Sequence, residues 1–469
     1  MSLITQLQNK QVLVLGLGIS GLSCVRYLVE QGLCFAVNDS RNKPVDSHWF
    51  SKTYPNINLV TGKWDSQLIA DADIIIASPG VDLQQAELVE NIKKSCQVLG
   101  DVELFFQLLA DHNKQPQIVA VTGSNGKSTV VSLLAHIANK LNINAQLAGN
   151  IGVPVFDILT SILNDEVGCL LLELSSFQLE TLSTMQAITA TILNVSDDHL
   201  DRHLTLENYQ TIKQRIYGNT RHIIFNRDDT LTYPKKVNHC QTVTSFGSGE
   251  AASGEFGLID NEQGLQLSFG NQPLVAVSHL PIAGIHNALN CLAALALGDK
   301  LGWDLSAMVN ALTSFKGLPH RCEKINSKDS IIWVNDSKAT NVGATLAAIE
   351  GLAKIKTAAQ QLILIAGGDG KGADFLPLQQ VFNDKVDLLI TLGKDGDKLA
   401  TLKAEHIVAS SLTQAVIIAK QHAKAGDIVL LSPACASLDM FESYAQRGQC
   451  FADAIHCNNT DVMQEVSDD

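Results

Sequence analysis

The chain is 469 residues long, enough for roughly two to four domains that each bury a core of their own. Hydrophobic residues make up 46% of it and charged residues 17%, a composition typical of soluble globular proteins. The net charge is −14 and no basic stripe is visible in the sequence, so we expect no nucleic-acid partner.

The ten cysteines are scattered, without a C-x-x-C pair or metal-finger spacing, as in proteins of a reducing compartment. Apolar residues 12–15 run straight into a glycine turn, which is not the pattern of a signal peptide. No apolar run approaches the roughly 20 residues of a membrane span. We therefore expect a cytoplasmic protein that does not engage a membrane.

The first predicted unit is glycine-rich. A strand at residues 12–15 leads into Gly16-x-Gly18-x-x-Gly21, a helix at 22–31 and a second strand that ends near Asp39 and Arg41. This turn lets a diphosphate approach the backbone, but taken alone it leaves NAD, NADP and nucleotide-sugar diphosphates open. With a further strand before Ser78-Pro-Gly80, residues 1–106 read as a nucleotide-binding α/β domain of Rossmann type.

The most informative stretch lies between a predicted strand at 118–121 and a predicted helix at 130–141. From position 122 it reads Thr-Gly-Ser-Asn-Gly-Lys-Ser-Thr, shorter than G-x-x-x-x-G-K-[ST] because position 121 is Val. Backbone N–H groups of such a loop bind phosphate, and Lys127 adds a point charge while Ser128 is placed to hold Mg²⁺. The sequence predicts a nucleoside triphosphate site here.

Acidic and histidine side chains follow two later strands of the same predicted sheet. Glu173 ends an apolar run at 169–172, and Asp198 and His199 follow a strand near 191–195. Ligands bind at the carboxyl ends of parallel strands, so these residues are candidate metal ligands. Lys213 lies on the next predicted helix, and its spacing alone does not distinguish it from a surface lysine.

The rest of the chain completes two further units. Short antiparallel strands are predicted between 240 and 280, and the helix after residue 284 places Asn287 and Asn290 on one face. Strands near 331–334, 362–366, 387–391 and 428–431 alternate with helical stretches. We predict an α/β fold of three mainly parallel sheets with flanking helices, in domains 1–106, 107–317 (a P-loop ATPase unit) and 318–469 (Rossmann-like).

Several motifs in one order resemble the Mur ligases, the ATP-dependent enzymes that append amino acids to the peptidoglycan precursor. The resemblance covers nearly the whole chain. The motifs are Thr122 to Thr129, Leu172 to Gln178, Asn194 to His199, His286-Asn287, Leu318 to Arg321 and Asp336 to Asn341. Gly367 to Gly372 and Leu431 to Asp439 are most similar to the branch that adds D-glutamate to UDP-N-acetylmuramoyl-L-alanine.

The resemblance implies an acyl-phosphate intermediate, two Mg²⁺ sites, a CO₂-derived carbamate on Lys213 and a monomer. The implied ATP contacts are Gly123, Asn125, Gly126, Lys127, Ser128, Thr129, Asn287, Arg321, Asp336 and Lys338. The implied UDP-substrate contacts are Gly18, Ile19, Asp39, Ser40, Arg41, Ser78, Gly80 and Asn150. D-Glutamate is expected at Thr340, Lys371, Ser437 and Tyr444; at the last position an aromatic without a hydroxyl also occurs in the family. The catalytic set is Lys127, Asn150, Glu173, His199 and Lys213, and the metal set is Ser128, Glu173, His199 and Lys213.

Other readings were weighed against this one. A folylpolyglutamate synthase-like ligase, or another Mur ligase, shares the ATP core, although the former has no use for a UDP-binding first domain. An NAD(P)-dependent oxidoreductase built on Gly16 to Gly21 leaves Lys127, Glu173 and His199 without a role. A non-catalytic nucleotide-switched protein has no need of the metal ligands.

Overall fold

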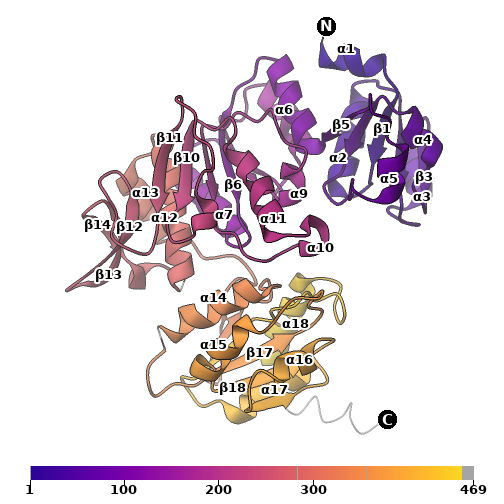
Figure 1. Ribbon diagram of the computed structural model, residues 1–469. Coiled ribbons are helices and arrows are strands. Elements are labelled where there is room, and N and C mark those ends of the chain that lie inside the picture. The colour runs from indigo at the N-terminus through magenta and orange to yellow at the C-terminus, as the bar shows by residue number, and fades with distance from the viewer. Residues whose placement is uncertain (1, 283, 355, 457–469) are drawn as a thin grey trace, which may run out of the picture. The chain divides into compact units, whose positions relative to one another are not determined.

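The computed structural model describes residues 2–282, 284–354 and 356–456 (Figure 1). Three separate sheets hold the strands of this part of the chain, and each is mainly parallel with flanking helices, as predicted. None of the described helices is long and apolar enough to cross a membrane. The cysteines in the described ranges are free thiols.

The N-terminal sheet has five parallel strands in the order β3-β2-β1-β4-β5. Its strands are β1 (Val12–Leu15), β2 (Phe35–Asp39), β3 (Asn58–Thr61), β4 (Ile74–Ala77) and β5 (Gln97–Gly100). Its helices are α1 (Leu3–Gln8), α2 (Ile19–Glu30), α3 (Ser47–Thr53), α4 (Ser66–Asp71), α5 (Ala86–Asn91) and α6 (Asp101–Asp111). Along β1, Val12 and Val14 enter one core while Leu13 and Leu15 enter another, because successive strand residues face opposite sides.

The second sheet has nine strands in the order β14-β13-β12-β11-β10-β9-β6-β8-β7. They are β6 (Gln117–Thr122), β7 (Ala145–Gly149), β8 (Cys169–Glu173), β9 (Thr189–Ile192), β10 (His222–Asn226), β11 (Thr242–Phe246), β12 (Phe256–Asn261), β13 (Gly264–Phe269) and β14 (Gln272–Ala276). The α-helices are α7 (Lys127–Lys140), α8 (Leu159–Leu163), α9 (Ser176–Leu179), α10 (Leu200–His203), α11 (Leu206–Lys213), α12 (Ile285–Lys300) and α13 (Leu305–Leu312). Short 3₁₀ turns are η1 (Val155–Ile158), η2 (Gln214–Tyr217), η3 (Thr230–Thr232) and η4 (Val277–His279).

One expectation for this sheet is wrong. Strands between 240 and 280 were predicted to be antiparallel, but β11 pairs with β12 in parallel through Phe246 and Phe256. Because Phe246 ends β11 and Phe256 begins β12, the second strand continues in the same direction from the point where the first one ends, and the two strands form no hairpin.

The C-terminal sheet has six strands in the order β15-β16-β20-β17-β18-β19. They are β15 (Glu323–Ile325), β16 (Ile332–Asn335), β17 (Leu362–Gly367), β18 (Leu388–Leu392), β19 (His406–Val408) and β20 (Ile428–Leu431), with only β15 shown antiparallel to its neighbour β16. The helices are α14 (Val342–Ala353), α15 (Pro377–Lys385), α16 (Gly396–Ala400), α17 (Leu412–His422) and α18 (Tyr444–His456). One core contains residues of α14 and α15 and the other contains residues of α17 and α18, so helices cover both faces.

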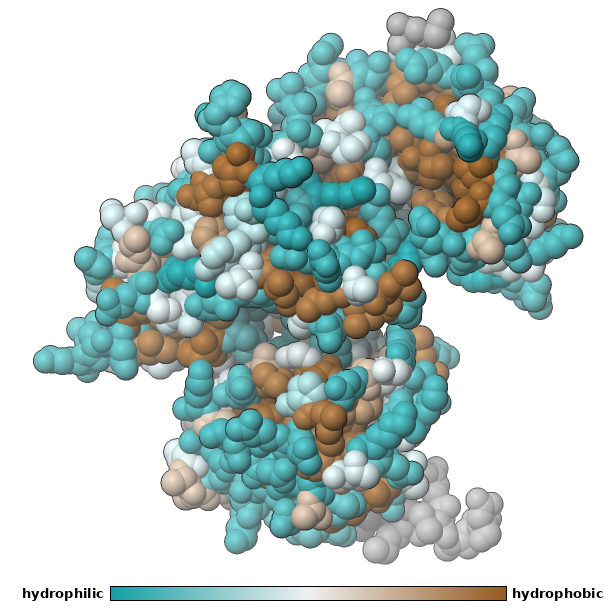
Figure 2. Space-filling model, viewed as in Figure 1, coloured by the Kyte–Doolittle hydropathy of each residue, from teal (hydrophilic) through white to brown (hydrophobic). Residues whose placement is uncertain are grey.

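Most of the face drawn in Figure 2 is hydrophilic, with apolar groups in separate patches. Three strands that matter for function, β16, β20 and β17, are adjacent and parallel, so their carboxyl ends meet at one edge of the C-terminal sheet. In the second sheet β6, β8 and β9 do the same. The polar loops picked out by the sequence follow these strands. The three domain boundaries themselves stay a prediction.

Candidate active site

The predicted phosphate loop joins β6 to α7. Gly126 caps the helix with φ +85°, a left-handed conformation that glycine adopts without steric cost. The helix begins at Lys127, so Lys127 and Ser128 lie in its first turn, ahead of the apolar residues at helical spacing that start at Val130. Lys127 Nζ donates to the carbonyl oxygens of Gly123 (2.6 Å) and Ser124 (2.9 Å). Its ammonium therefore lies against the loop, while Ser128 and Thr129 are buried in the first helical turn.

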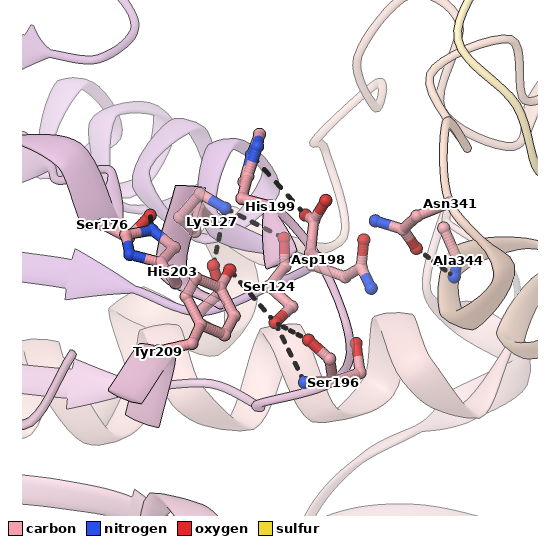
Figure 3. A network of polar contacts seen from close by, with 12 residues as sticks. Ser124, Lys127, Ser176, Ser196, Asp198, His199, His203, Tyr209, Asn341 and Ala344 are labelled. Carbon is pink, nitrogen blue, oxygen red and sulfur yellow. Dashed lines mark hydrogen bonds and ion pairs between the residues drawn. The ribbon is translucent and has the colours of Figure 1, made fainter. Parts of the chain in front are cut away.

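The segment that follows β9 holds this loop in place. Asn194 accepts from the backbone N–H of Asn125 (2.8 Å) and donates to its carbonyl oxygen (3.1 Å). Ser124 Oγ donates to the Ser196 carbonyl (3.1 Å) and accepts from the Ser196 N–H (3.0 Å), as Figure 3 shows. The loop conformation is thus specified by hydrogen bonds from a neighbouring strand end as well as by its glycines.

Lys213, at the end of α11, also contacts the phosphate loop. Its side chain is 1% exposed, and Nζ donates to the Gly123 carbonyl (3.0 Å) and to Thr122 Oγ1 (3.4 Å). The Tyr209 ring, one helical turn before it on α11, lies 4.3 Å from Nζ. Burial lowers the pKa of Lys213 well below its usual value, and the charge of Lys127 lowers it further. The structure therefore gives Lys213 a place in the site that its spacing could not.

Glu173 ends β8 beside Val121 of β6. Its Oε1 accepts from Asn150 Nδ2 (2.7 Å), and the Asn150 N–H donates to the Glu173 carbonyl (2.9 Å). Gly149, with φ +104°, allows this approach, because a Cβ there would lie 2.3 Å from the Glu173 carbonyl oxygen. Two residues of the predicted catalytic set are thus joined directly.

His199 and Asp198 occupy the start of α10. His199 caps the helix with φ +54°, its Nε2 lies 3.8 Å from Asp198 Oδ2, and its ring packs edge-on against Phe177 at 4.8 Å. Figure 3 shows the two side chains beside Lys127 and Ser124. The half-exposed imidazole is therefore presented close to the phosphate loop.

The donor set was tested for its fit to a magnesium ion. Glu173 is 1% exposed, yet its Oε2 has no hydrogen-bond partner among the described residues. A buried carboxylate oxygen without a donor is costly unless a ligand or cation satisfies it. Within the same ranges no group of three or more His, Cys, Asp or Glu side chains is arranged for a metal ion. One carboxylate and one hydroxyl are nevertheless typical protein ligands for Mg²⁺, which otherwise retains water and phosphate oxygens.

The N-terminal residues divide into those that build the edge of the sheet and those that are open on it. Asp39 accepts from the Leu17 N–H (2.7 Å) and binds the Arg41 guanidinium (2.7 Å). Burial would raise the pKa of Asp39, but these donors more than offset it and lower the pKa. Ser78 Oγ donates to the Gly16 carbonyl (2.8 Å). The more open positions in the predicted UDP set are Gly18, Ile19, Ser40, Arg41 and Gly80.

In the C-terminal sheet, Asp336 follows β16 and is buried. It accepts from Ser432 Oγ (3.0 Å) and from the Cys322 N–H (3.2 Å), and burial raises its pKa to about 7. Lys338 Nζ lies 4.3 Å from the centre of the Tyr444 ring, a cation–π contact that joins a predicted ATP residue to a predicted glutamate residue.

The remaining predicted ATP and D-glutamate residues lie on loops of the C-terminal sheet and on α12 of the second sheet. Lys371 is exposed with φ +50°, and its N–H donates to Asp369 Oδ1 (2.9 Å). Ser437 is buried and Thr340 half-buried. Asn287 accepts from Asn290 Nδ2 (3.2 Å) on α12, as their spacing predicted. Arg321 precedes Cys322, and its charge lowers the pKa of Asp336, a minor influence beside burial.

Three residues with structural roles in the site received no role from the sequence, although Asn194 stands first in the motif from Asn194 to His199. Asn194 fixes the phosphate loop, Tyr209 covers Lys213 and Arg447 binds two loops of the C-terminal sheet. Tyr209 had a signal, because it lies four residues before Lys213 on one helix. Arg447 had none, since its partners are more than a hundred residues away or on an irregular loop.

Family models match three successive parts of the chain. They are the Mur ligase MurD-like N-terminal domain (residues 10–100), the Mur ligase middle domain (121–298) and the Mur ligase glutamate ligase domain (320–435). The UDP-N-acetylmuramoylalanine–D-glutamate ligase of Colwellia psychrerythraea is 50% identical over 467 residues, 97% of this chain and 98% of that one. The chain belongs to the Mur ligase family.

Further relatives agree with this membership. The protein of the same name in Shewanella violacea is 45% identical over 439 residues, 94% of each chain. Among solved structures, the UDP-N-acetylmuramate–alanine ligase of Thermotoga maritima has a TM-score of 0.58 at 18% identity, covering 95% of this chain and 98% of that one. MurF of Acinetobacter baumannii has a TM-score of 0.57 at 19% identity, covering 84% and 92%. These two establish the fold that Mur ligases share.

Proposed function

We propose that this Mur ligase adds D-glutamate to UDP-N-acetylmuramoyl-L-alanine, with cleavage of ATP to ADP and phosphate. The printed names of relatives up to 50% identical over nearly the full chain support this choice of substrates. The observation that carries the chemistry is the convergence of Lys127 and the buried Lys213 on the phosphate loop, where both amines donate to the Gly123 carbonyl. We further propose that it acts in the cytoplasm, as a monomer, in peptidoglycan precursor synthesis.

The reaction needs activation of the acid, because a carboxylate and an amine do not condense in neutral water. In the proposed route the substrate carboxylate attacks the γ-phosphorus of ATP, giving an acyl phosphate and ADP. The D-glutamate amine then attacks the acyl carbon, and phosphate leaves from the tetrahedral intermediate. At ~4 Å and an effective dielectric near 20, each pair of approaching unit negative charges repels by roughly 4 kcal/mol. Lys127 lowers this repulsion from the loop itself.

Magnesium would supply further positive charge beside the phosphates. The proposed ligands are Ser128, Glu173, His199 and the modified Lys213, serving two metal sites. The unsatisfied Oε2 of Glu173 supports this assignment. Asn150 holds the other oxygen of Glu173 and so orients the carboxylate. Asn150 and His199 are also proposed to contact the acyl group.

Lys213 is proposed to carry a carbamate. The ammonium would first lose one proton, and the neutral amine nitrogen would then bond to the carbon of CO₂ and release a second proton, so that a +1 group becomes a −1 group. Burial and the neighbouring Lys127 support this step, because both favour the neutral amine. The resulting carboxylate would attract a metal ion that an ammonium repels.

The glycine turn at 16–21 is proposed to hold the UDP moiety, with Gly18, Ile19, Ser40, Arg41 and Gly80 along the open edge. In a dinucleotide site the acidic residue after the second strand accepts from the ribose hydroxyls. Here the Asp39 carboxylate is already engaged by Leu17 and Arg41, which weighs against NAD(P) and for a role in positioning Arg41. Asp336, Lys338, Asn287 and Arg321 are assigned to ATP, and Thr340, Lys371, Ser437 and Tyr444 to D-glutamate.

The test is the substrate requirement for ADP release. We expect ADP to form at a sustained rate only when ATP, Mg²⁺, UDP-N-acetylmuramoyl-L-alanine and D-glutamate are all present. Sustained ADP release without the UDP substrate would contradict the proposal, and so would hydride transfer to or from NAD(P).

A further inference from the structure

One arginine lies where three loops of the C-terminal sheet meet. Arg447 belongs to α18 and is 2% exposed. The loops follow β16, β20 and β17, which are adjacent strands in that order. They carry Asp336 and Lys338, then Ser437, and finally Lys371.

The guanidinium binds the first two loops directly. Arg447 Nε donates to Ser337 Oγ (3.0 Å) and Nη2 donates to the Ser337 carbonyl (2.8 Å). Nη2 also donates to the Cys435 carbonyl (3.1 Å), and Nη1 donates to the Ala436 carbonyl (3.3 Å). Ser337 and Ala436 are each next to a residue assigned to a substrate, namely Asp336 and Lys338 on one loop and Ser437 on the other.

The third loop packs against this arrangement without room for a side chain. Gly368 has φ +129°, and a Cβ there would lie 2.3 Å from the Ala436 carbonyl oxygen and 3.3 Å from Arg447 Nη1. Ala436 and Asp369 also exchange backbone hydrogen bonds of 2.8 and 3.0 Å. The segment just before Lys371 is therefore hydrogen-bonded to the Ala436 carbonyl, which also accepts from Arg447.

Helix α18 makes a second set of contacts with the loop that follows β16 and carries Asp336 and Lys338. Ser337 Oγ donates to the Tyr444 carbonyl (2.8 Å), and Lys338 Nζ lies over the Tyr444 ring. Tyr444 and Arg447 are three residues apart on α18, so they lie on one face of it. One turn of α18 thus contacts Ser337 twice, through the Tyr444 carbonyl and through the Arg447 guanidinium.

The stability of the fold does not by itself explain why the guanidinium of Arg447 is buried here. All four acceptors are uncharged oxygens, and burial lowers the pKa of Arg447 to about 10. Removing a guanidinium from water without a carboxylate partner is costly. What arginine adds is a planar fork of five donors, which fixes several acceptors in one geometry and which lysine lacks.

We propose that Arg447 is a positioning residue that fixes the Asp336–Lys338 loop relative to the loops of Ser437 and Lys371, so that the nucleotide and the amino acid are bound in one arrangement. The inference rests on the proposed assignment of those loops to ATP and D-glutamate. It adds a residue that touches neither substrate but sets how both are presented.

The test uses Arg447→Lys in the full chain, which keeps a cation and removes the fork. We expect the KM values for ATP and D-glutamate to rise together by about tenfold or more, with a smaller change in kcat. The KM for UDP-N-acetylmuramoyl-L-alanine should stay within about twofold, because its assigned residues lie outside these loops. A general loss of stability would not produce this split.

Lys420→Met is the matched control. Lys420 Nζ donates to the Ala454 and Ile455 carbonyls at the other end of α18, so its loss loosens the same helix away from the loops. We expect its three KM values to stay within about twofold of wild type. The proposal is overturned if Arg447→Lys leaves the KM values for ATP and D-glutamate unchanged, or if Lys420→Met raises them equally.

Two further variants keep the result decisive. Should Arg447→Lys not fold, Ser337→Ala removes the Nε acceptor, and we expect about a two- to fivefold rise in both KM values; no rise in either overturns the proposal. Lys371→Ala tests the assignment beneath it and should raise the KM for D-glutamate. If it does not, the glutamate subsite is misplaced and the inference falls with it; if it does while Arg447→Lys has no effect, the inference alone is wrong.

Discussion

Lys213 is the residue whose environment says most about its chemistry. It is buried between the phosphate loop and the Tyr209 ring, and Lys127 adds a second cation nearby. A free lysine has a pKa of ~10.4 and is almost fully protonated at neutral pH, which prevents reaction with CO₂. In this site the proton is disfavoured, so the amine is available for modification.

For Lys213 we predict that both Lys213→Ala and Lys213→Arg lose activity, the second because guanidinium keeps the positive charge and cannot form the carbamate. Short carboxylic acids should partly restore Lys213→Ala by filling the vacated space, and should not restore Lys213→Arg. ADP release measures both. Lys235→Arg, at an exposed lysine between η3 and β11, serves as control and should remain active. A fully active Lys213→Arg enzyme would show that the carbamate has no role.

Lys127→Ala should abolish acyl-phosphate formation and leave thermal unfolding nearly unchanged, since Lys127 is only half-buried. Lys140→Ala, at the exposed C-terminal end of the same helix, should behave as wild type. Steady-state ADP release compares the two. Retention of more than about a tenth of wild-type turnover in Lys127→Ala, a loss below ~1.4 kcal/mol in the barrier, counts against the assigned role.

Asp336 should make stability depend on pH. Burial raises its pKa to about 7, against ~3.9 in an unfolded chain, so the folded state holds the proton more tightly between these values. Its contribution to the free energy of unfolding therefore falls as pH rises from about 4 to about 7 and is level above that. Asp336→Asn removes this titration.

Urea unfolding of Asp336→Asn and wild type at pH 5 and pH 8 measures the effect. From pH 5 to pH 8, the free energy of unfolding of the variant should rise relative to that of wild type by on the order of 1–3 kcal/mol. Asp384→Asn, at an exposed position of α15, should run parallel to wild type. If the free energy of unfolding of Asp336→Asn also followed that of wild type with pH, the pKa of Asp336 in the folded wild-type protein would not be raised.

At the scale of elements, the site depends on pairs of strand ends that hold one another. The loop after β6 is bound by the loop after β9 through Asn194, and β8 is bound to the end of β7 through Asn150 and Glu173. Such contacts restrict a loop that would otherwise lose entropy on binding phosphate. Preorganisation of the phosphate loop is therefore a property of several strands together.

Asn194→Ala should weaken ATP binding without unfolding the protein. Two hydrogen bonds to Asn125 are lost, each worth about 1 kcal/mol net, so we expect roughly a five- to thirtyfold rise in the dissociation constant of ATP. Isothermal titration measures it. Asn219→Ala removes an asparagine hydrogen bond to Ser183 at an exposed position and should leave ATP affinity unchanged. If wild type, Asn194→Ala and Asn219→Ala bound ATP with equal affinity, Asn194 would have no role in ATP binding.

Across the whole molecule, much of the fold followed from local pattern. Apolar runs of four to six residues ending in glycine or polar residues predicted β1, β6, β8 and β17, because buried parallel strands need both features. The start of α7 followed from the glycine loop and not from apolar periodicity: the helix begins at Lys127 after left-handed Gly126, and the periodicity begins only later. The parallel pairing of β11 with β12 was not predicted, because alternation along a strand does not encode the direction of its neighbour.

The site was predictable where its residues follow strands and less so where the partners are distant. Glu173 and the phosphate loop could be placed together, because β6 and β8 are both buried strands with polar ends. Asp39 was expected near the uridine, but its carboxylate is engaged by Leu17 and Arg41. The burial of Lys213 and the four acceptors of Arg447 arise from packing between segments far apart in the chain, which no local pattern shows.

Co-substrate selectivity shows which amino acid the enzyme adds. ADP release should be measured with ATP, Mg²⁺ and UDP-N-acetylmuramoyl-L-alanine while single amino acids are added at equal concentration. We predict turnover with D-glutamate and little with L-glutamate, L-alanine or meso-diaminopimelate, because Lys371 and the segment from Ser432 to Asp439 are proposed to bind D-glutamate. Equal or better turnover with any of the other three would contradict the account.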